Sequence, residues 1–138
     1  MAKTCAKQTI SYESAAKMVA AAVTKAAQLG CKQNVAVVAD GGNLKAFGRM
    51  DGAALLGLEG CQRKAFTALF GVGTQDLYNA IKEDQSLVIG LSHFSRATMV
   101  GGGLPIIVDG EIVGGIGVGG GTVDEDVACS QAGLDALD

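Results

Sequence analysis

The chain has 138 residues, enough for one domain with a substantial hydrophobic core. Hydrophobic residues make up 49% of it, charged residues 18%, and the formal net charge is −3, a balance typical of a globular domain. There is no basic run that would attract nucleic acid, and lysines interrupt the longest apolar stretch, Ala15–Ala27. We therefore expect a protein that binds neither nucleic acid nor a membrane.

The N-terminus and the cysteines predict a cytoplasmic location. The first residues lack the charged, apolar and small-residue order of a signal peptide. The four cysteines show no C-x-x-C spacing, and with a single histidine they make a poor set of metal ligands. We expect reduced thiols that pack as small core residues.

The first half of the chain predicts a helix, a hairpin and a second helix. Ser11 is a suitable N-cap for a helix with a 3.6-residue apolar period, and Gly30 ends it. Two short apolar runs, Val35–Ala39 and Leu44–Met50, flank a glycine-containing turn and predict a hairpin. Helical spacing then returns over Ala53–Phe70.

The second half predicts a short helix, a loop and another hairpin. Thr74 is expected to cap a helix over Gln75–Ile81, whereas the weak pattern of Glu83–Val100 predicts a loop with at most one short strand. An Asp-Gly pair joins the apolar runs Leu104–Val108 and Ile112–Val118, a strong indication of a hairpin.

A last helix is predicted from Val123, preceded by the capping box Thr122-Val-Asp-Glu125. Two hairpins separated by helices predict an α+β fold, with a single antiparallel sheet and flanking helices. We find no linker, so residues 1–138 form one predicted domain.

The glycines of the last hairpin suggest the first candidate site. Gly115 and Gly117 leave one face of their strand almost without side chains, which lets a ligand or another backbone approach closely. Gly101, Gly102 and Gly103 precede the hairpin and are further candidate ligand contacts. A dinucleotide-binding interpretation of the G-x-G-x-x-G spacing fails, because three carboxylates open the helix that follows and no strand comes after it.

Four side chains are candidates for catalysis. Lys64 emerges from a helix face of small residues, and Arg49 and Asp51 stand at a strand end beside Met50, a further candidate ligand contact. His93, the only histidine, is a candidate acid–base group or metal ligand. For each of them a purely structural or solvent-exposed role remains open.

Several motifs occur in a characteristic order: Arg49-Met50-Asp51-Gly52, Lys64-Ala65, Gly101-Gly102-Gly103-Leu104-Pro105, Asp109-Gly110 and the run Gly114–Asp126. Together they resemble the GlcG/HbpS-type, or haem-degrading, family, which includes the C-terminal domain of PduO, over about residues 9–137. The resemblance implies a profilin- or PAS-like sheet with flanking helices, assembly into dimers and often octamers, and haem as the ligand of some relatives.

The chain departs from this family in two places. PduO-like relatives are associated with a histidine ligand in the first helix, where this chain has Lys17 and Met18, and the spacing of Met18 fits the core. The loop Ser92–Thr98, with His93 and Arg96, also differs from the loop expected in the family. A small ligand other than haem therefore stays open.

Two functional hypotheses follow, beside a third in which the chain is only a structural or regulatory module. The first is a cytoplasmic, oligomeric small-molecule-binding protein with haem or another tetrapyrrole as its nominal ligand. The second is a cofactor-free isomerase, lyase or hydratase of a catabolic pathway. It would use Lys64 and Arg49 as electrophilic groups, and His93 or Asp51 as general base.

Small-residue surfaces also predict assembly. The first helix is rich in alanine, Gly57 and Gly60 share a stripe of the second helix, and Val113 is expected to be exposed beside glycines. Close packing between subunits would bury these surfaces. We expect a symmetric homodimer or a larger closed homo-oligomer, up to the octamer that the resemblance implies.

Overall fold

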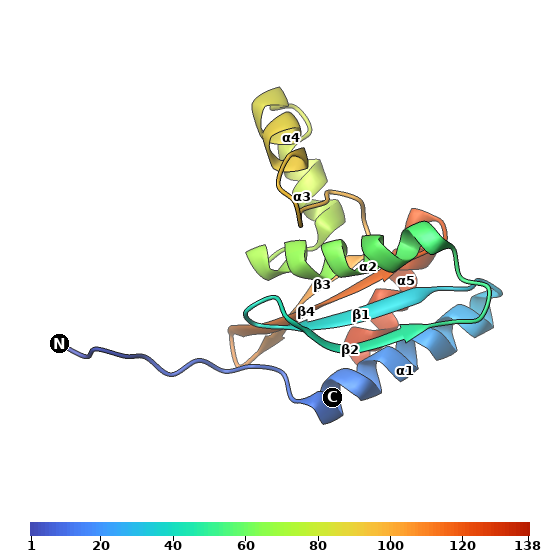
Figure 1. Cartoon of the computed structure of the whole chain (residues 1–138), viewed down its shortest axis with the longest axis horizontal. Coiled ribbons are helices and arrows are strands. Elements are labelled where there is room, and N and C mark those ends of the chain that lie inside the picture. The colour runs from blue at the N-terminus through green and yellow to red at the C-terminus, as the bar shows by residue number, and fades with distance from the viewer.

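The computed structural model describes all 138 residues, which form five α-helices, one short 3₁₀ helix and four strands (Figure 1). In chain order the elements are α1 (Tyr12–Leu29), β1 (Asn34–Ala39), β2 (Leu44–Arg49), α2 (Leu55–Thr67), η1 (Ala68–Phe70), α3 (Thr74–Ile81), α4 (Gln85–Ser92), β3 (Gly103–Val108), β4 (Glu111–Gly119) and α5 (Val123–Asp135). None of the helices is long and apolar enough to span a bilayer.

The four strands form a single sheet in the order β2-β1-β4-β3, and every neighbouring pair is antiparallel. Each predicted hairpin is present, and the pairing of β1 with β4 joins them. Helices α1 and α5 pack together on one face, and α2 lies on the other (Figure 1). The predicted α+β fold with one antiparallel sheet is confirmed.

The two faces of the sheet differ in how they are packed. Val35, Val37, Ile116 and Val118 point toward α1 and α5 and belong to the main hydrophobic core. The opposite face carries a smaller cluster, in which the short side chains of β1 meet α2. Glycines of β4 complete that second face, because Ala36 pairs with Gly117 and Val38 with Gly115.

Helix α2 covers the glycine face of β4. A Cβ atom at Gly117 would collide with the carbonyl oxygen of Cys61, and one at Gly115 with that of Ala65. The backbone that approaches the side-chain-free face of β4 is therefore that of α2 in the same chain. No space for a ligand remains between the strand and the helix at these two glycines.

Most predicted helix ends are confirmed. The Ser11 side chain accepts a hydrogen bond from the Ser14 amide, and Gly30 ends α1 in the left-handed conformation. At α5 both hydrogen bonds of the predicted capping box are present. Thr74 begins α3 rather than capping it, and its Oγ1 accepts a hydrogen bond from the Gly103 amide at 3.0 Å.

Two predictions about local structure were wrong. The loop expected over residues 83–100 contains α4, which Asp84 caps by accepting hydrogen bonds from the amides of Ser86 and Leu87. Its helical pattern was weak because none of its residues is buried. Val113, expected to be exposed, is buried in the main core, since the β3–β4 register shifts there.

Helices α3 and α4 form an arm that projects from the body of the molecule (Figure 1). Leu77 and Ile81 of α3 are buried, whereas α4 buries nothing. Apolar side chains of and beside α4 remain in contact with water: Leu87 is 44% exposed, Ile89 57% and Phe94 62%. The fold itself therefore leaves much of the apolar surface of the arm uncovered.

The two glycines of α2 provide a matched test of the helix–sheet contact. At Gly57 an added Cβ would lie 2.5 Å from the carbonyl oxygen of Gly119, whereas at Gly60 it would meet nothing within 4 Å. We predict that Gly57→Ala lowers the free energy of unfolding by about 3 kcal/mol, because neither the backbone of α2 nor that of β4 can move away from the added methyl group. Gly60→Ala should raise it by about 1 kcal/mol through better helix propensity.

Urea unfolding followed by circular dichroism measures both changes. Equal stability of Gly57→Ala and the wild type would contradict the contact between α2 and β4.

Candidate functional site

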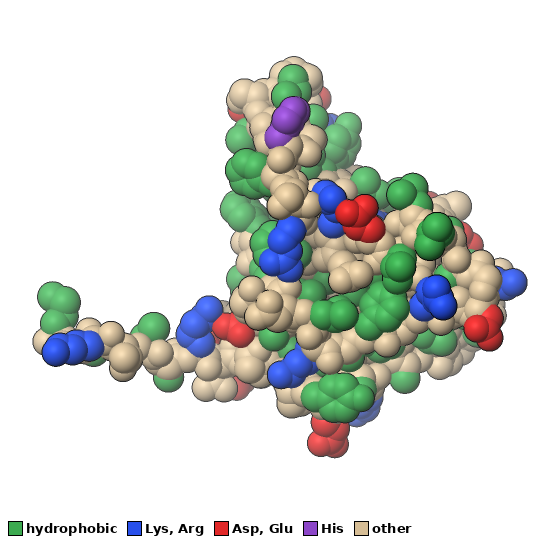
Figure 2. Space-filling view, viewed as in Figure 1, with side chains coloured by type: hydrophobic (Ala, Val, Ile, Leu, Met, Phe, Trp, Pro, Cys, Tyr) green, Lys and Arg blue, Asp and Glu red, His purple; other side chains and the backbone are tan.

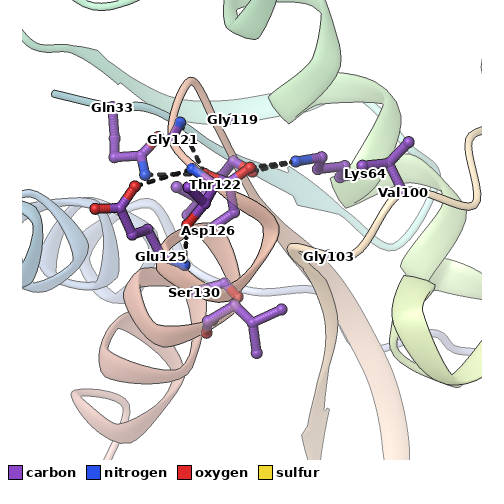
Figure 3. Close-up of polar contacts among 12 residues, drawn as sticks. Gln33, Lys64, Val100, Gly103, Gly119, Gly121, Thr122, Glu125, Asp126 and Ser130 are labelled. Carbon is purple, nitrogen blue, oxygen red and sulfur yellow. Dashed lines mark hydrogen bonds and ion pairs between the residues drawn. The ribbon is translucent and has the colours of Figure 1, made fainter. Parts of the chain in front are cut away.

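A buried ion pair lies at one end of the sheet. Lys64 of α2 is 5% exposed, and its Nζ lies 2.7 Å from Oδ2 of Asp126 in α5. The same ammonium donates a hydrogen bond of 2.9 Å to the carbonyl of Val118 at the end of β4 (Figure 3). The pair therefore connects two helices that lie on opposite faces of the sheet.

The second carboxylate oxygen of Asp126 is also satisfied. Its Oδ1 accepts hydrogen bonds from Nε2 of Gln33 at 2.8 Å and from the amide of Gly121 at 3.0 Å (Figure 3). Asp126 lies in the first turn of α5, where the helix dipole favours a negative charge. A buried charge needs this degree of compensation, because desolvation of an unpaired ion costs several kcal/mol.

The predicted glycine run surrounds this ion pair. Gly102 has a φ of 126°, and a Cβ there would lie 3.0 Å from Nζ of Lys64. Its carbonyl accepts a hydrogen bond from the amide of Val118, and the neighbouring Gly101 and Gly103 are buried as well. Gly102 and Gly103 thus pack against Lys64, whereas a Cβ at Gly101 would meet Gln75 and Val123.

Arg49, Met50 and Asp51 lie at the same end of the sheet but do not touch Lys64. Met50 is linked to Gln33 twice: its amide donates to the Gln33 carbonyl, and its sulfur accepts from the Gln33 amide. Arg49 and Asp51 are exposed, and no ion pair joins them to each other or to Lys64. Met50 therefore helps to hold Gln33 in place, whereas the charged side chains of Arg49 and Asp51 are exposed to solvent.

His93 lies apart from the ion pair, on the surface of the projecting arm, where Figure 2 shows the only histidine of the chain. It follows the last residue of α4 and is exposed. Its Nδ1 lies 2.9 Å from the carbonyl oxygen of Ile89, so the ring donates its proton there and leaves Nε2 free. Lys64, Arg49, Asp51 and His93 therefore do not form one catalytic site.

Two polar residues next to the ion pair were missed by sequence reasoning. Gln33 and Asn34 are fully buried, and the amide oxygen of each has no hydrogen-bond partner. The Asn34 amide nitrogen donates to the carbonyls of Ala54 and Gly119. Nothing in a Lys-Gln-Asn sequence after a helix predicts burial, because it is the convergence of β1, α2 and β4 that covers these side chains.

The buried thiols have the properties of core residues. Burial raises the pKa of Cys61, which lies three residues before Lys64, to about 12. Burial likewise raises the pKa of Cys129 in α5 to about 12. Neither side chain is a thiolate at neutral pH, so neither is a ready nucleophile. No group of three metal-ligating side chains occurs in the chain.

Two shallow grooves flank α2. One, of about 430 Å³, lies between α2 and the segments 97–100 and 120–121, and reaches Lys64. The other, of about 560 Å³, lies at the base of the arm and is lined by leucines and by Arg63 and Arg96. The Arg96 guanidinium lies 3.8 Å from the centre of the Phe66 ring. The second groove combines apolar surface with two cations.

Helix α2 takes part in two ion pairs, the buried Lys64–Asp126 pair and the exposed Glu59–Arg63 pair, and these allow a direct comparison. We predict that Asp126→Ala lowers the free energy of unfolding by about 3–5 kcal/mol, because it leaves the Lys64 ammonium buried without a counter-charge. Glu59→Ala breaks the exposed pair with Arg63 and should cost less than about 1 kcal/mol. Chemical denaturation measures both.

The double variant Lys64→Met/Asp126→Asn removes both charges and keeps an oxygen for Gln33 and Gly121. It should recover most of the loss, since no unpaired ion remains. A double variant as unstable as Asp126→Ala alone would show that the lost charge pairing is not the cause.

Comparison with known proteins identifies the family of this chain. Residues 10–135 match the family described as haem degrading protein HbpS-like. A Citrobacter freundii protein of 15.0 kDa from the dhaT–dhaS intergenic region is 34% identical over 131 residues, 94% of this chain and 92% of that protein.

Two solved structures are similar over most of the chain. A double mutant of Streptomyces reticuli HbpS has a TM-score of 0.90 and 30% identity, covering 99% of this chain and 92% of that one. A structure described as a PduOC:heme complex has a TM-score of 0.86 and 29% identity, covering 93% and 94%. The chain therefore belongs to the HbpS-like family of haem-degrading proteins, as its motifs predicted.

Proposed function

We propose that this protein binds haem at its projecting arm, where His93 would hold the iron. The proposal rests on the hydrogen bonding of the two nitrogens of the His93 ring. Its Nδ1 is engaged by the Ile89 carbonyl, and its Nε2 is free and exposed. A histidine that binds a metal usually has this arrangement, because the hydrogen bond fixes the tautomer and the ring orientation.

The surroundings of His93 suit a flat apolar ligand with a charged edge. Phe94 directly follows the histidine and Ile89 lies one helical turn before it, and each exposes more than half of its surface. Leu87, two residues before Ile89, is 44% exposed. Arg96, Arg63 and Glu59 line the groove at the base of the arm, and because Glu59 pairs with Arg63, Arg96 is the cation left for an acidic group. Figure 2 shows blue and red side chains there, next to an apolar surface. Haem has an apolar ring and two propionates, which these groups can accommodate.

The methionine of the first helix is not an alternative ligand. Met18 is completely buried in the main core, as its spacing predicted, and its sulfur is not available to an iron outside the core. The relative described as a PduOC:heme complex supports haem as the ligand class.

The alternative of a cofactor-free enzyme finds less support. It needs Lys64 as an electrophilic group, and this ammonium is bound by Asp126 and by the Val118 carbonyl. Arg49 and Asp51, its other suggested groups, lie in solvent without a partner. The geometry favours binding over catalysis, and we assign the ion pair to the scaffold.

Haemin titration tests the ligand. We predict a shifted Soret band that saturates at one haemin per chain, and at least a tenfold weaker affinity for His93→Ala, corresponding to about 1.4 kcal/mol. Ser92→Ala, which changes the neighbouring exposed side chain, is the matched control and should bind like the wild type. An unchanged spectrum and affinity in His93→Ala would refute the assignment of His93.

We further propose that the protein is a cytoplasmic homo-oligomer. Leu55 and Leu56 at the start of α2 are 79% and 84% exposed. A single chain leaves these side chains in water, whereas a symmetric contact would bury them. Gly57 gives no support for such a contact, because it packs against this chain's own sheet. The four free thiols suit the cytoplasm.

Light scattering coupled to size exclusion tests the assembly. We predict a wild-type mass of at least twice 13.9 kDa, and a smaller mass for Leu56→Asp, which places a charge on the exposed apolar start of α2. Tyr12→Ser alters an exposed aromatic residue on α1 and should leave the mass unchanged. A wild-type monomer at micromolar concentration would contradict the proposal.

A further inference from the structure

The groove at the base of the arm contains a guanidinium group that the fold holds in one orientation. The central carbon of the Arg96 guanidinium lies 3.8 Å from the centre of the Phe66 ring, and Nη2 donates a hydrogen bond to the carbonyl of Gly42. Gly42 lies in the turn between β1 and β2, where an added Cβ would be 2.8 Å from the same ring. The turn, the ring and the guanidinium therefore pack against one another.

This packing leaves most of the hydrogen-bonding capacity of Arg96 unused. A guanidinium has five N–H groups, and only one of those of Arg96 donates to an acceptor of the chain, which leaves four. Arg96 also takes part in none of the three ion pairs. Arg63, the other arginine of the groove, is paired with Glu59 at 2.8 Å. Arg96 is therefore the one cation of the groove without an anionic partner.

The wall of the groove beside Arg96 is apolar. Val38, Leu44 and Leu58 contribute to it, and Leu44 is 50% exposed. A ligand that covered Leu44 would remove apolar surface from water. The volume of about 560 Å³ lies in the usual range for small-molecule sites. The groove therefore suits a ligand with an anionic end and an apolar body.

We propose that this groove binds a free carboxylic acid with a small apolar body, whose carboxylate accepts two hydrogen bonds from Arg96. The planar fork of a guanidinium matches the two oxygens of a carboxylate. A second carboxylate on the ligand would find no unpaired cation in the groove and would meet Glu59. The ligand class is therefore a monocarboxylate with an aromatic or branched body.

This acid site does not depend on the proposed binding of haem. His93 is not among the residues that line the groove, so the acid and the iron would use different side chains. They share one group, because we assigned a haem propionate to Arg96 as well. A bound monocarboxylate should therefore compete with that propionate and weaken the binding of haem.

Isothermal titration calorimetry with three related probes tests the ligand class on the unaltered protein. Phenylacetate should bind saturably with one molecule per chain. Phenylacetamide has the same shape without the charge, and phenylmalonate carries a second carboxylate. Each of these two should bind more weakly by about tenfold or more. Equal affinity for phenylacetate and phenylacetamide, or no binding of phenylacetate, would overturn the proposal.

Variants test the role of Arg96. Arg96→Gln should weaken phenylacetate binding by about tenfold or more, and Arg96→Lys, which keeps the charge without the fork, should lie between Arg96→Gln and the wild type. The matched control Glu59→Gln/Arg63→Gln removes the neighbouring ion pair without changing the net charge, and its affinity should stay within about twofold of the wild type. Circular dichroism checks that each variant is folded. Wild-type affinity in Arg96→Gln would contradict the site.

Nuclear magnetic resonance locates the bound probe. Phenylacetate should shift the backbone amides of Gly42 and Asn43, which line the groove. The amides of Gly120 and Gly121, which line the groove on the other side of α2, should not move. Shifts at Gly120 and Gly121 without any at Gly42 and Asn43 would place the acid elsewhere and refute the assignment.

Two further titrations separate this inference from the proposed function. His93→Ala should bind phenylacetate like the wild type, and saturating phenylacetate should weaken haemin binding to the wild type. Binding of phenylacetate by a protein that takes up no haemin would support the acid site and contradict only the haem proposal. Haemin binding by a protein that does not bind phenylacetate would contradict only the acid site.

Discussion

The contact between the backbone of α2 and the backbone of β4 is the constraint on which the rest of the structure depends. It exists because Gly115 and Gly117 have no side chain at the positions where the carbonyls of α2 meet the strand. A helix this close to the sheet buries the whole of Lys64 at the end of the strand. The ammonium then requires a counter-charge and acceptors, which Asp126 and the Val118 carbonyl provide.

This dependence assigns different roles to the two ends of the molecule. At the ion pair, glycines, a buried glutamine and a capped helix all serve to compensate one buried charge, so the region acts as a rigid scaffold. The arm of α3 and α4 buries few of its residues and exposes apolar side chains beside the only histidine. Binding surfaces are commonly found on such less stable, projecting elements. These features are the basis of our proposal that the ligand binds on the arm.

Local patterns were sufficient for most of the fold but not for the site. Period, caps and turn glycines predicted both hairpins, α1 and α5, because each depends on neighbouring residues. Helix α4 was missed since a helix that buries nothing has no amphipathic period. Lys64 and the glycine run were singled out correctly as unusual, yet their partners Gln33 and Asp126 come from distant segments. Gly115 and Gly117 indicated that another group approaches the strand closely, but they did not show whether that group is a ligand or a helix.

The central functional claim is that His93 holds an iron on the arm, and its most direct test uses the fact that the chain has one histidine. Protein grown with histidine that carries a heavy nitrogen isotope is labelled at His93 alone. Pulsed electron paramagnetic resonance of the ferric haem complex then detects any directly bound histidine nitrogen. We predict a strong hyperfine coupling to the labelled nitrogen. A stoichiometric haem complex without that coupling would contradict the account.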